Sequence, residues 1–147
     1  MLFDSIVDIL PHLADPSVLD RIARLWPGAL TVVVRAAEDS PIVSPVVTEA
    51  RTIGIRKPDD SIARSVIRAA GGVLAVTSAN THGEDPATTA DEVLLTFGEL
   101  LPVVDGGSRE GGVPSTVVDL TSDVPRILRQ GSIDVSDVLG TEPDAPE

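Results

Sequence analysis

The stretch TIGIRKPDDSIARSVIRAAGGVLAVT, residues 52–77, predicts three consecutive elements and decides the fold class. Residues 52–56 and 73–77 are rich in β-branched and other apolar side chains, which is typical of strands. Between them, residues 59–70 place apolar side chains at helical spacing. A strand, a helix and a strand in succession indicate an α/β or α+β sheet.

Boundary signals agree with this interpretation and extend it along the chain. Pro58 cannot donate to a strand ladder, Asp59-Asp60 can cap a helix, and Gly71-Gly72 can end it. The same reasoning predicts further strands at 30–35, 102–105, 116–120 and 126–129, helices at 16–25 and 89–97, a last helical turn or two within 133–139, and a mobile glycine-rich loop at 106–112. We expect the strands from 30–35 to 116–120 to lie in one sheet.

Length and composition indicate one globular domain. The chain has 147 residues, of which 42% are hydrophobic and 23% charged, and we expect a domain over residues 1–139 and an acidic flexible tail over 140–147. No apolar run reaches about 18 residues and no signal peptide is recognisable, which predicts a cytoplasmic protein without a membrane segment. Because the chain has no cysteine and two histidines, a disulfide framework and a thiolate nucleophile are excluded, and no metal site is expected.

Charge limits the kinds of partner. A net charge of −12 disfavours nucleic-acid binding, and aromatic residues make up only 2% of the chain, which leaves few rings for bases to stack on. Lys57 is the only lysine, so arginines supply nearly all the positive charge. The planar guanidinium group suits carboxylates and phosphates.

Three loops at the ends of predicted strands carry groups that could bind such anions. Arg56-Lys57-Pro58 offers two cations, Thr77-Ser78-Ala79-Asn80 offers hydroxyls and an amide, and the segment 111–116 offers backbone N–H groups and the Ser115 hydroxyl. Each also has a structural interpretation, as a solvated charge pair or as ordinary turn and cap residues. His82 has no fixed carboxylate partner and receives no catalytic role, and the absence of a Gly-x-x-x-x-Gly-Lys-Ser/Thr motif excludes a P-loop nucleotidase.

Five segments in order resemble one known family. They are Leu25-Trp26-Pro27-Gly28-Ala29-Leu30-Thr31, Ile53-Gly54-Ile55-Arg56-Lys57-Pro58, Thr77-Ser78-Ala79-Asn80 with Gly83, Pro114-Ser115-Thr116-Val117-Val118-Asp119 and Arg126-Ile127-Leu128-Arg129-Gln130-Gly131. Together they look like the Sua5/YciO/YrdC family. The resemblance implies a twisted, open α/β sheet with flanking helices and a positively lined concave face.

The resemblance also implies an activity. Family members are L-threonylcarbamoyladenylate synthases, which convert threonine, bicarbonate and ATP into threonylcarbamoyl-AMP and pyrophosphate for the N6-threonylcarbamoyl modification of adenosine 37 in tRNA. The implied partners are therefore threonine, bicarbonate, ATP with Mg²⁺ as its counter-ion, and a tRNA-modifying transferase that uses the product. No tightly bound cofactor is implied.

Residue roles carry over by position. The resemblance implies that threonine contacts Arg56, the main chain of Val76 and Ser115. It implies that ATP contacts the residues Thr52, Ser78, Pro86 and Arg129. It identifies no catalytic group and no metal ligand. From the ends of the predicted strands we expect Arg56, Ser78, Ser115 and Arg129 to converge on one cavity.

Departures from the family pattern lead to further expectations. In the family, an N-terminal segment supplies a Pro-Thr-x-Thr strand end and a Lys-x-Arg pair, and Met1 aligns downstream of both. His82 and Asp85 stand where family members commonly have serine and proline. We therefore expect the chain alone to be a weak or inactive synthase, and an uncovered sheet edge or apolar face to favour self-association. The alternatives are an incomplete threonine- or nucleotide-binding paralogue, and an RNA-binding module, against which the net charge and the single lysine count.

Overall fold

The computed structural model describes residues 1–42, 46–81, 83–109 and 113–135, which fall into two compact units. Unit 1 comprises Met1–Ala75 and Pro114–Glu147, and unit 2 comprises Val76–Val113. The predicted domain over 1–139 spans both units, and the predicted tail at 140–147 lies outside the described residues.

The elements are short, and most belong to unit 1. Its strands are β1 (Leu2–Phe3), β2 (Leu30–Arg35), β3 (Thr52–Ile55), β4 (Val73–Leu74), β5 (Thr116–Asp119) and β6 (Arg126–Arg129), and its α-helices are α1 (Ile6–Ile9) and α2 (Ser61–Ala69). Three 3-10 turns lie at Leu10–His12, Pro16–Arg21 and Ala23–Leu25. Unit 2 contains α3 (Ala90–Phe97), which a 3-10 turn at Gly98–Leu100 follows. No helix in the described part of the chain is long and apolar enough to cross a membrane.

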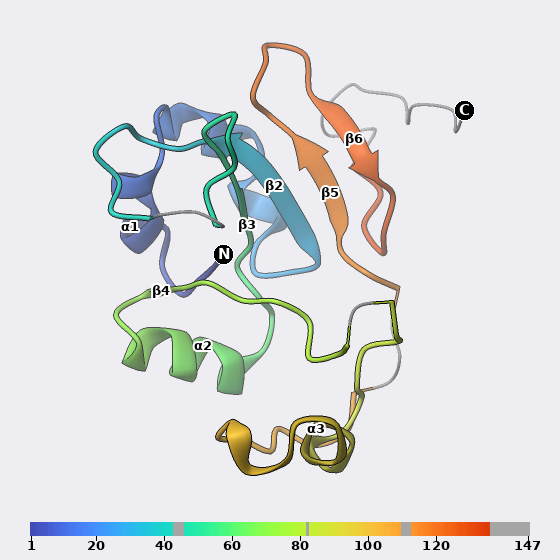
Figure 1. Ribbon diagram of the computed structural model, residues 1–147. Coiled ribbons are helices and arrows are strands. Elements are labelled where there is room, and N and C mark those ends of the chain that lie inside the picture. Colours follow the sequence, from blue (N-terminus) through green and yellow to red (C-terminus); the bar gives the residue numbers. More distant parts are fainter. Residues whose placement is uncertain (43–45, 82, 110–112, 136–147) are drawn as a thin grey trace. The chain divides into compact units, whose positions relative to one another are not determined.

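Four strands form the main sheet, in the order β3-β2-β5-β6 (Figure 1). β2 pairs antiparallel with β3 and parallel with β5, and β5 pairs antiparallel with β6. The register places Val32 opposite Ile55 and Leu30 opposite Thr116. β2 and β5 therefore begin at the same end of the sheet at which β3 and β6 finish.

Alternating side chains give the main sheet one buried face and one partly exposed face. Leu30, Val32 and Val34 of β2 are buried, as are Ile53 and Ile55 of β3, whereas the residues between them are more exposed. This period of two is what a half-buried strand requires. The alternation directs every second side chain of β2, beginning with Thr31, to the partly exposed face.

Trp26 closes the core beside the start of β2. It is 8% exposed, and its indole N–H donates to the carbonyl of Leu30 at 2.8 Å. Its ring meets Phe3 of β1 edge to face, with 5.0 Å between the ring centroids. Trp26 thus fills the core with its polar atom satisfied.

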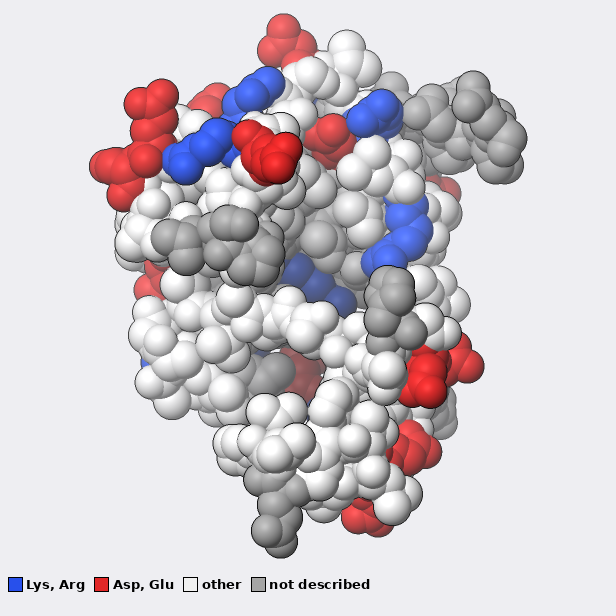
Figure 2. Space-filling model, viewed as in Figure 1, with Lys and Arg blue, Asp and Glu red and all other residues white. Residues whose placement is uncertain are grey.

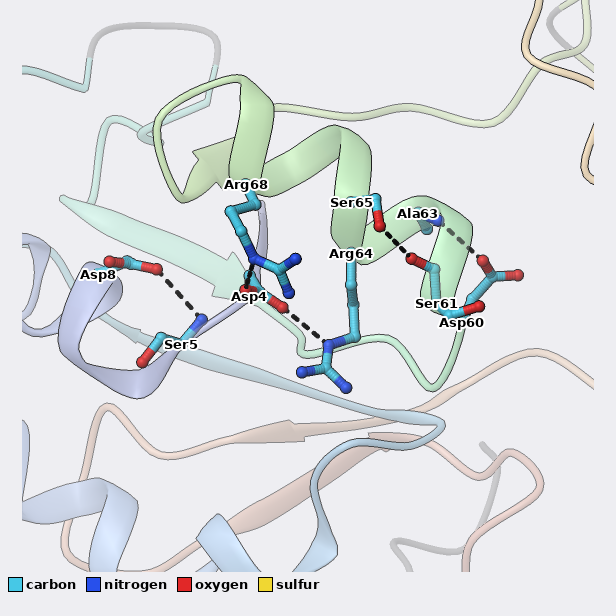
Figure 3. Close-up of polar contacts among 9 residues, drawn as sticks. All are labelled: Asp4, Ser5, Asp8, Asp60, Ser61, Ala63, Arg64, Ser65 and Arg68. Atoms are coloured by element: carbon cyan, nitrogen blue, oxygen red, sulfur yellow. Dashed lines mark hydrogen bonds and ion pairs between the residues drawn. The ribbon is translucent and has the colours of Figure 1, made fainter.

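Helix α2 is capped as predicted and is tied to the N-terminal strand. The Asp60 carboxylate accepts from the Ala63 N–H at 2.8 Å, and Gly71 and Gly72 end the helix with positive φ angles. At Gly72 a Cβ would lie only 2.6 Å from the Asp8 side chain, so the position requires glycine. Figure 3 shows Asp4 between two arginines of α2.

The fold class, a twisted sheet with flanking helices, is confirmed, but several predicted elements are wrong. The strand predicted at 73–77 is limited to Val73–Leu74 and pairs with β1 in a second sheet, because β1 offers only two residues for pairing. Residues 102–105 form no strand, and Val104 is 65% exposed. The strands therefore do not form one sheet.

The helix predicted at 16–25 is also wrong, since that segment forms two 3-10 turns interrupted at Ile22. Asp15 caps the first of them, accepting from the Ser17 N–H at 2.9 Å. Residues 133–135 are not helical, and residues 136–139 of that predicted turn lie outside the described residues, as do 110–112 of the glycine-rich loop.

Candidate functional site

Three of the predicted site residues lie at one end of the main sheet. Arg56 directly follows β3, Ser115 directly precedes β5, and Arg129 is the last residue of β6. The topology brings them together because parallel β2 and β5 begin where their antiparallel neighbours β3 and β6 finish. This end of the sheet therefore carries two cations and a hydroxyl.

Arg56 is a partly buried cation. Its Nε–H donates to the Gly28 carbonyl at 2.9 Å, and no acidic side chain in the described part of the chain forms an ion pair with it. Burial lowers the pKa of Arg56 from its ordinary value, because the charged form loses hydration. An arginine stays charged even so, and a bound carboxylate would compensate for the lost hydration.

Ser115 and Arg129 are joined by direct hydrogen bonds. Arg129 donates to the Ser115 carbonyl from Nε at 3.1 Å and from Nη2 at 2.9 Å, and Nη2 also donates to Ser115 Oγ at 3.2 Å. Ser115 is only 8% exposed, and its Oγ lies 2.9 Å from Oγ1 of Thr31 in β2. The hydroxyl is thus held between two strands.

Residues 131–133 hold the segment that carries Ser115 through hydrogen bonds to its neighbour Thr116. The buried Thr116 hydroxyl accepts from the N–H of Gly131 at 3.0 Å and of Ile133 at 3.2 Å. A Cβ on Gly131 would lie 2.2 Å from the Pro114 carbonyl oxygen, so only glycine fits there. This contact sets the position of Ser115 relative to Arg129.

Thr52 lies at the opposite end of the main sheet. It is the first residue of β3 and pairs with Arg35, the last residue of β2. Its Oγ1 lies 2.7 Å from Oγ1 of Thr48. The structure therefore does not bring Thr52 together with Ser115 and Arg129.

The remaining predicted site residues belong to unit 2. Val76 and Ser78 are exposed, and Pro86 and Asn80 line a cavity of about 340 Å³ within that unit. Asn80 closes the loop by donating from Nδ2 to the carbonyls of Thr81 and Glu84, both at 2.9 Å. His82 lies outside the described residues.

A metal site is not formed by the residues that the structure describes, since no three or more His, Asp or Glu side chains gather in a way that could hold an ion. Basic and acidic side chains are interspersed over the part of the surface formed by the main sheet, without a continuous basic patch in that view (Figure 2).

The sequence motifs assigned no role to three residues that lie at the site. Gly28 accepts from Arg56, Thr31 contacts Ser115, and Gly131 packs on the segment that carries Ser115. All three lie within the family motifs quoted above, so the motifs did indicate that these positions belong to the site. What those motifs cannot show is that Thr31 and Ser115, 84 positions apart, are in contact.

Comparison with known proteins identifies the family. The Sua5/YciO/YrdC family model, described as "Telomere recombination", matches residues 1–131. The chain belongs to this family. It is 36% identical over 139 residues to the threonylcarbamoyl-AMP synthase of Bacillus subtilis, and the match covers 85% of this chain and 40% of that protein. It is 36% identical over 117 residues to the synthase of Pyrococcus abyssi, covering 78% of this chain and 34% of that protein.

Solved structures of the family share the fold. P. abyssi Sua5 complexed with L-threonine matches with a TM-score of 0.82 and 32% identity, covering 95% of this chain and 42% of that chain. Escherichia coli YciO matches in fold with a TM-score of 0.78 at 24% identity, covering 94% of this chain and 68% of that chain. The chain thus spans less than half the length of the Bacillus and Pyrococcus proteins.

Proposed function

We propose that this chain binds L-threonine and ATP as part of a threonylcarbamoyl-AMP synthase. The observation that carries the proposal is the end of the main sheet where Arg56, Ser115 and Arg129 gather, in a chain that superposes over 95% of its length on a Sua5 protein complexed with L-threonine. Neither Arg56 nor Arg129 forms an ion pair within the described ranges of the chain, and two such arginines suit a carboxylate and a phosphate.

The proposed chemistry is adenylyl transfer. The threonine amine and bicarbonate give a carbamate and water, a carbamate oxygen attacks the α-phosphorus of ATP, and pyrophosphate leaves. Arg56 neutralises the threonine carboxylate, and Ser115 and the main chain of Val76 hold the rest of the amino acid. Arg129, with Ser78 and Pro86, contacts the nucleotide, and Mg²⁺ accompanies ATP. Positioning and charge neutralisation account for most of the catalysis in such transfers.

Titration calorimetry with L-threonine tests the binding step. Arg56→Ala should weaken binding by about thirtyfold or more, equivalent to ~2 kcal/mol, because the buried carboxylate loses its counter-charge. Arg24→Ala, which removes an exposed arginine from the 3-10 turn at Ala23–Leu25, is the matched control and should bind as the wild type does. Equal affinity of the Arg56→Ala variant and the wild type would remove Arg56 from the site.

Pyrophosphate release tests turnover. The purified chain is incubated with threonine, bicarbonate, Mg²⁺ and ATP, beside a full-length synthase. Release at a comparable rate supports the synthase function of this chain and contradicts the expectation that the chain alone is weak or inactive. Threonine binding without release supports the alternative of a binding paralogue and contradicts turnover by this chain alone.

A further inference from the structure

Thr31 lies in the middle of the proposed threonine site, on the partly exposed face of the main sheet. It is one residue before Val32, which pairs with Ile55, and it pairs across the other edge of β2 with Val117. Its Oγ1 is 2.9 Å from Ser115 Oγ. Its methyl carbon lies 3.8 Å from where a Cβ on Gly54 would be, so the side chain has room over β3 and directs its hydroxyl toward β5.

Counting hydrogens at Ser115 limits the possible bonds. The guanidinium of Arg129 can only donate, so Ser115 Oγ is the acceptor of the bond from Nη2 at 3.2 Å. Thr31 and Ser115 have two hydroxyl hydrogens between them, and the bond that joins the two oxygens uses one. One O–H therefore remains to donate to a third partner.

The burial of Ser115 favours one of the two arrangements. A hydroxyl oxygen can accept two hydrogen bonds and donate one. If Thr31 donates to Ser115 Oγ, this 8% exposed residue accepts from both Thr31 and Arg129 and has its own hydrogen left for a ligand. Once a ligand oxygen accepts that hydrogen, all of the hydrogen-bonding capacity of Ser115 is used, as a buried polar group requires.

We propose that Thr31 is a positioning residue. Its hydroxyl donates to Ser115 Oγ and so directs the Ser115 hydrogen toward an oxygen of L-threonine bound at Arg56. This inference rests on the proposed function and assigns the Thr31 hydroxyl a part in substrate binding.

Matched substitutions at Thr31 separate the hydroxyl from the shape of the side chain. Thr31→Val keeps the branched shape and removes the hydroxyl, and it should weaken threonine binding about five- to tenfold in calorimetry, as the loss of one hydrogen bond predicts. Thr31→Ser keeps the hydroxyl and should bind within about twofold of the wild type. Thr31→Ala should reproduce Thr31→Val and covers the case in which the valine variant misfolds.

A double-mutant cycle shows whether Thr31 acts through Ser115. In the Ser115→Ala background, Thr31→Val should cause no further loss of affinity, because the hydroxyl that it orients is gone. Ser65→Ala, which removes a helix-surface hydroxyl bonded to the Ser61 carbonyl, is the control and should bind normally.

The outcomes separate this inference from the proposed function. Three results would each overturn the role of Thr31 and leave the proposed function standing. The first is wild-type threonine affinity in both Thr31→Val and Thr31→Ala, and the second is a further loss of affinity when Thr31→Val is added to Ser115→Ala. The third is a Thr31→Ser variant that binds threonine as weakly as Thr31→Val does. A wild-type chain that binds no threonine would overturn both.

Discussion

Asp4 connects β1 to α2 through two arginines. Its Oδ1 accepts from Arg64 Nε and its Oδ2 from Arg68 Nε, both at 2.8 Å (Figure 3). The hydrogen bonds from Arg68 and Arg64 lower the pKa of the Asp4 carboxyl, because they favour its charged form. The folded protein therefore holds this proton more weakly than the unfolded chain does.

The sign of the resulting pH dependence follows from that lowered pKa. The stabilisation by Asp4 is fully present above the pKa of the unfolded carboxyl, about 4, and is lost as the pH falls through the lower pKa of the folded state. The wild type should lose more free energy of unfolding between about pH 6 and pH 3 than Asp4→Asn does, as measured by urea unfolding across that range.

Asp39→Asn, in the exposed loop after β2, is the control for this comparison and should keep the wild-type pH dependence. Parallel profiles for the wild type and Asp4→Asn would show that the arginine contacts do not favour the charged carboxylate.

Among the elements, the hairpin of β5 and β6 depends on one glycine beyond its second strand. A Cβ at Gly131 would lie 2.2–2.4 Å from three backbone atoms between Pro114 and Thr116. Because backbone cannot move aside as a flexible side chain can, Gly131→Ala should destabilise the protein by about 1–3 kcal/mol in urea unfolding.

The matched control is Gly54→Ala in β3. A Cβ there would meet only the Thr31 methyl at 3.8 Å, an ordinary contact, so the free energy of unfolding should change by less than about 1 kcal/mol. A Gly131→Ala variant as stable as Gly54→Ala would contradict the close approach at residue 131.

Predictions from the sequence succeeded for elements whose signals are local. The β-branched residues of β2 and the Asp and Gly caps of α2 are local signals, and the structure confirms both elements. The strand predicted at 102–105 failed because a run of apolar residues does not reveal whether a partner strand exists. β1 was missed because two residues carry no measurable period.

The predictions for the candidate site also differ in outcome. The position at a strand end predicted that Arg56, Ser115 and Arg129 gather, and the topology brings these three to one end of the sheet. Thr52 begins the strand that Arg56 follows, so the two lie at opposite ends of β3. The predicted gathering of Ser78 with the other three stays a prediction.

At the scale of the whole molecule, the two units differ in how much they bury. Every buried apolar side chain in the described residues belongs to unit 1, whereas α3 has none, and Leu95 and Leu100 are 86% and 85% exposed. Unit 2 contains one basic residue and seven acidic ones, and acidic charges predominate over α3 in Figure 2. Local stability follows apolar burial, so unit 2 should open at a lower free energy than unit 1.

Hydrogen exchange followed by mass spectrometry measures this difference. Peptides from α3 should exchange roughly tenfold faster or more than peptides from β2 and β5, because no buried apolar side chain anchors that helix. Equal protection in α3 and β2 would contradict it and would indicate that a partner or a second copy of the chain covers the exposed leucines. The expected self-association would be one such case.

Trp26, which fills the core beside β2, is the only tryptophan of a chain that has no tyrosine. The intrinsic fluorescence of the whole protein therefore arises at one place, where the indole is bonded to the Leu30 carbonyl and stacked edge to face on Phe3. Its emission should shift to the red when the start of β2 opens to water. The chain thus contains an optical reporter that is hydrogen-bonded to Leu30, the residue before Thr31, and that senses the end of the sheet carrying the candidate site.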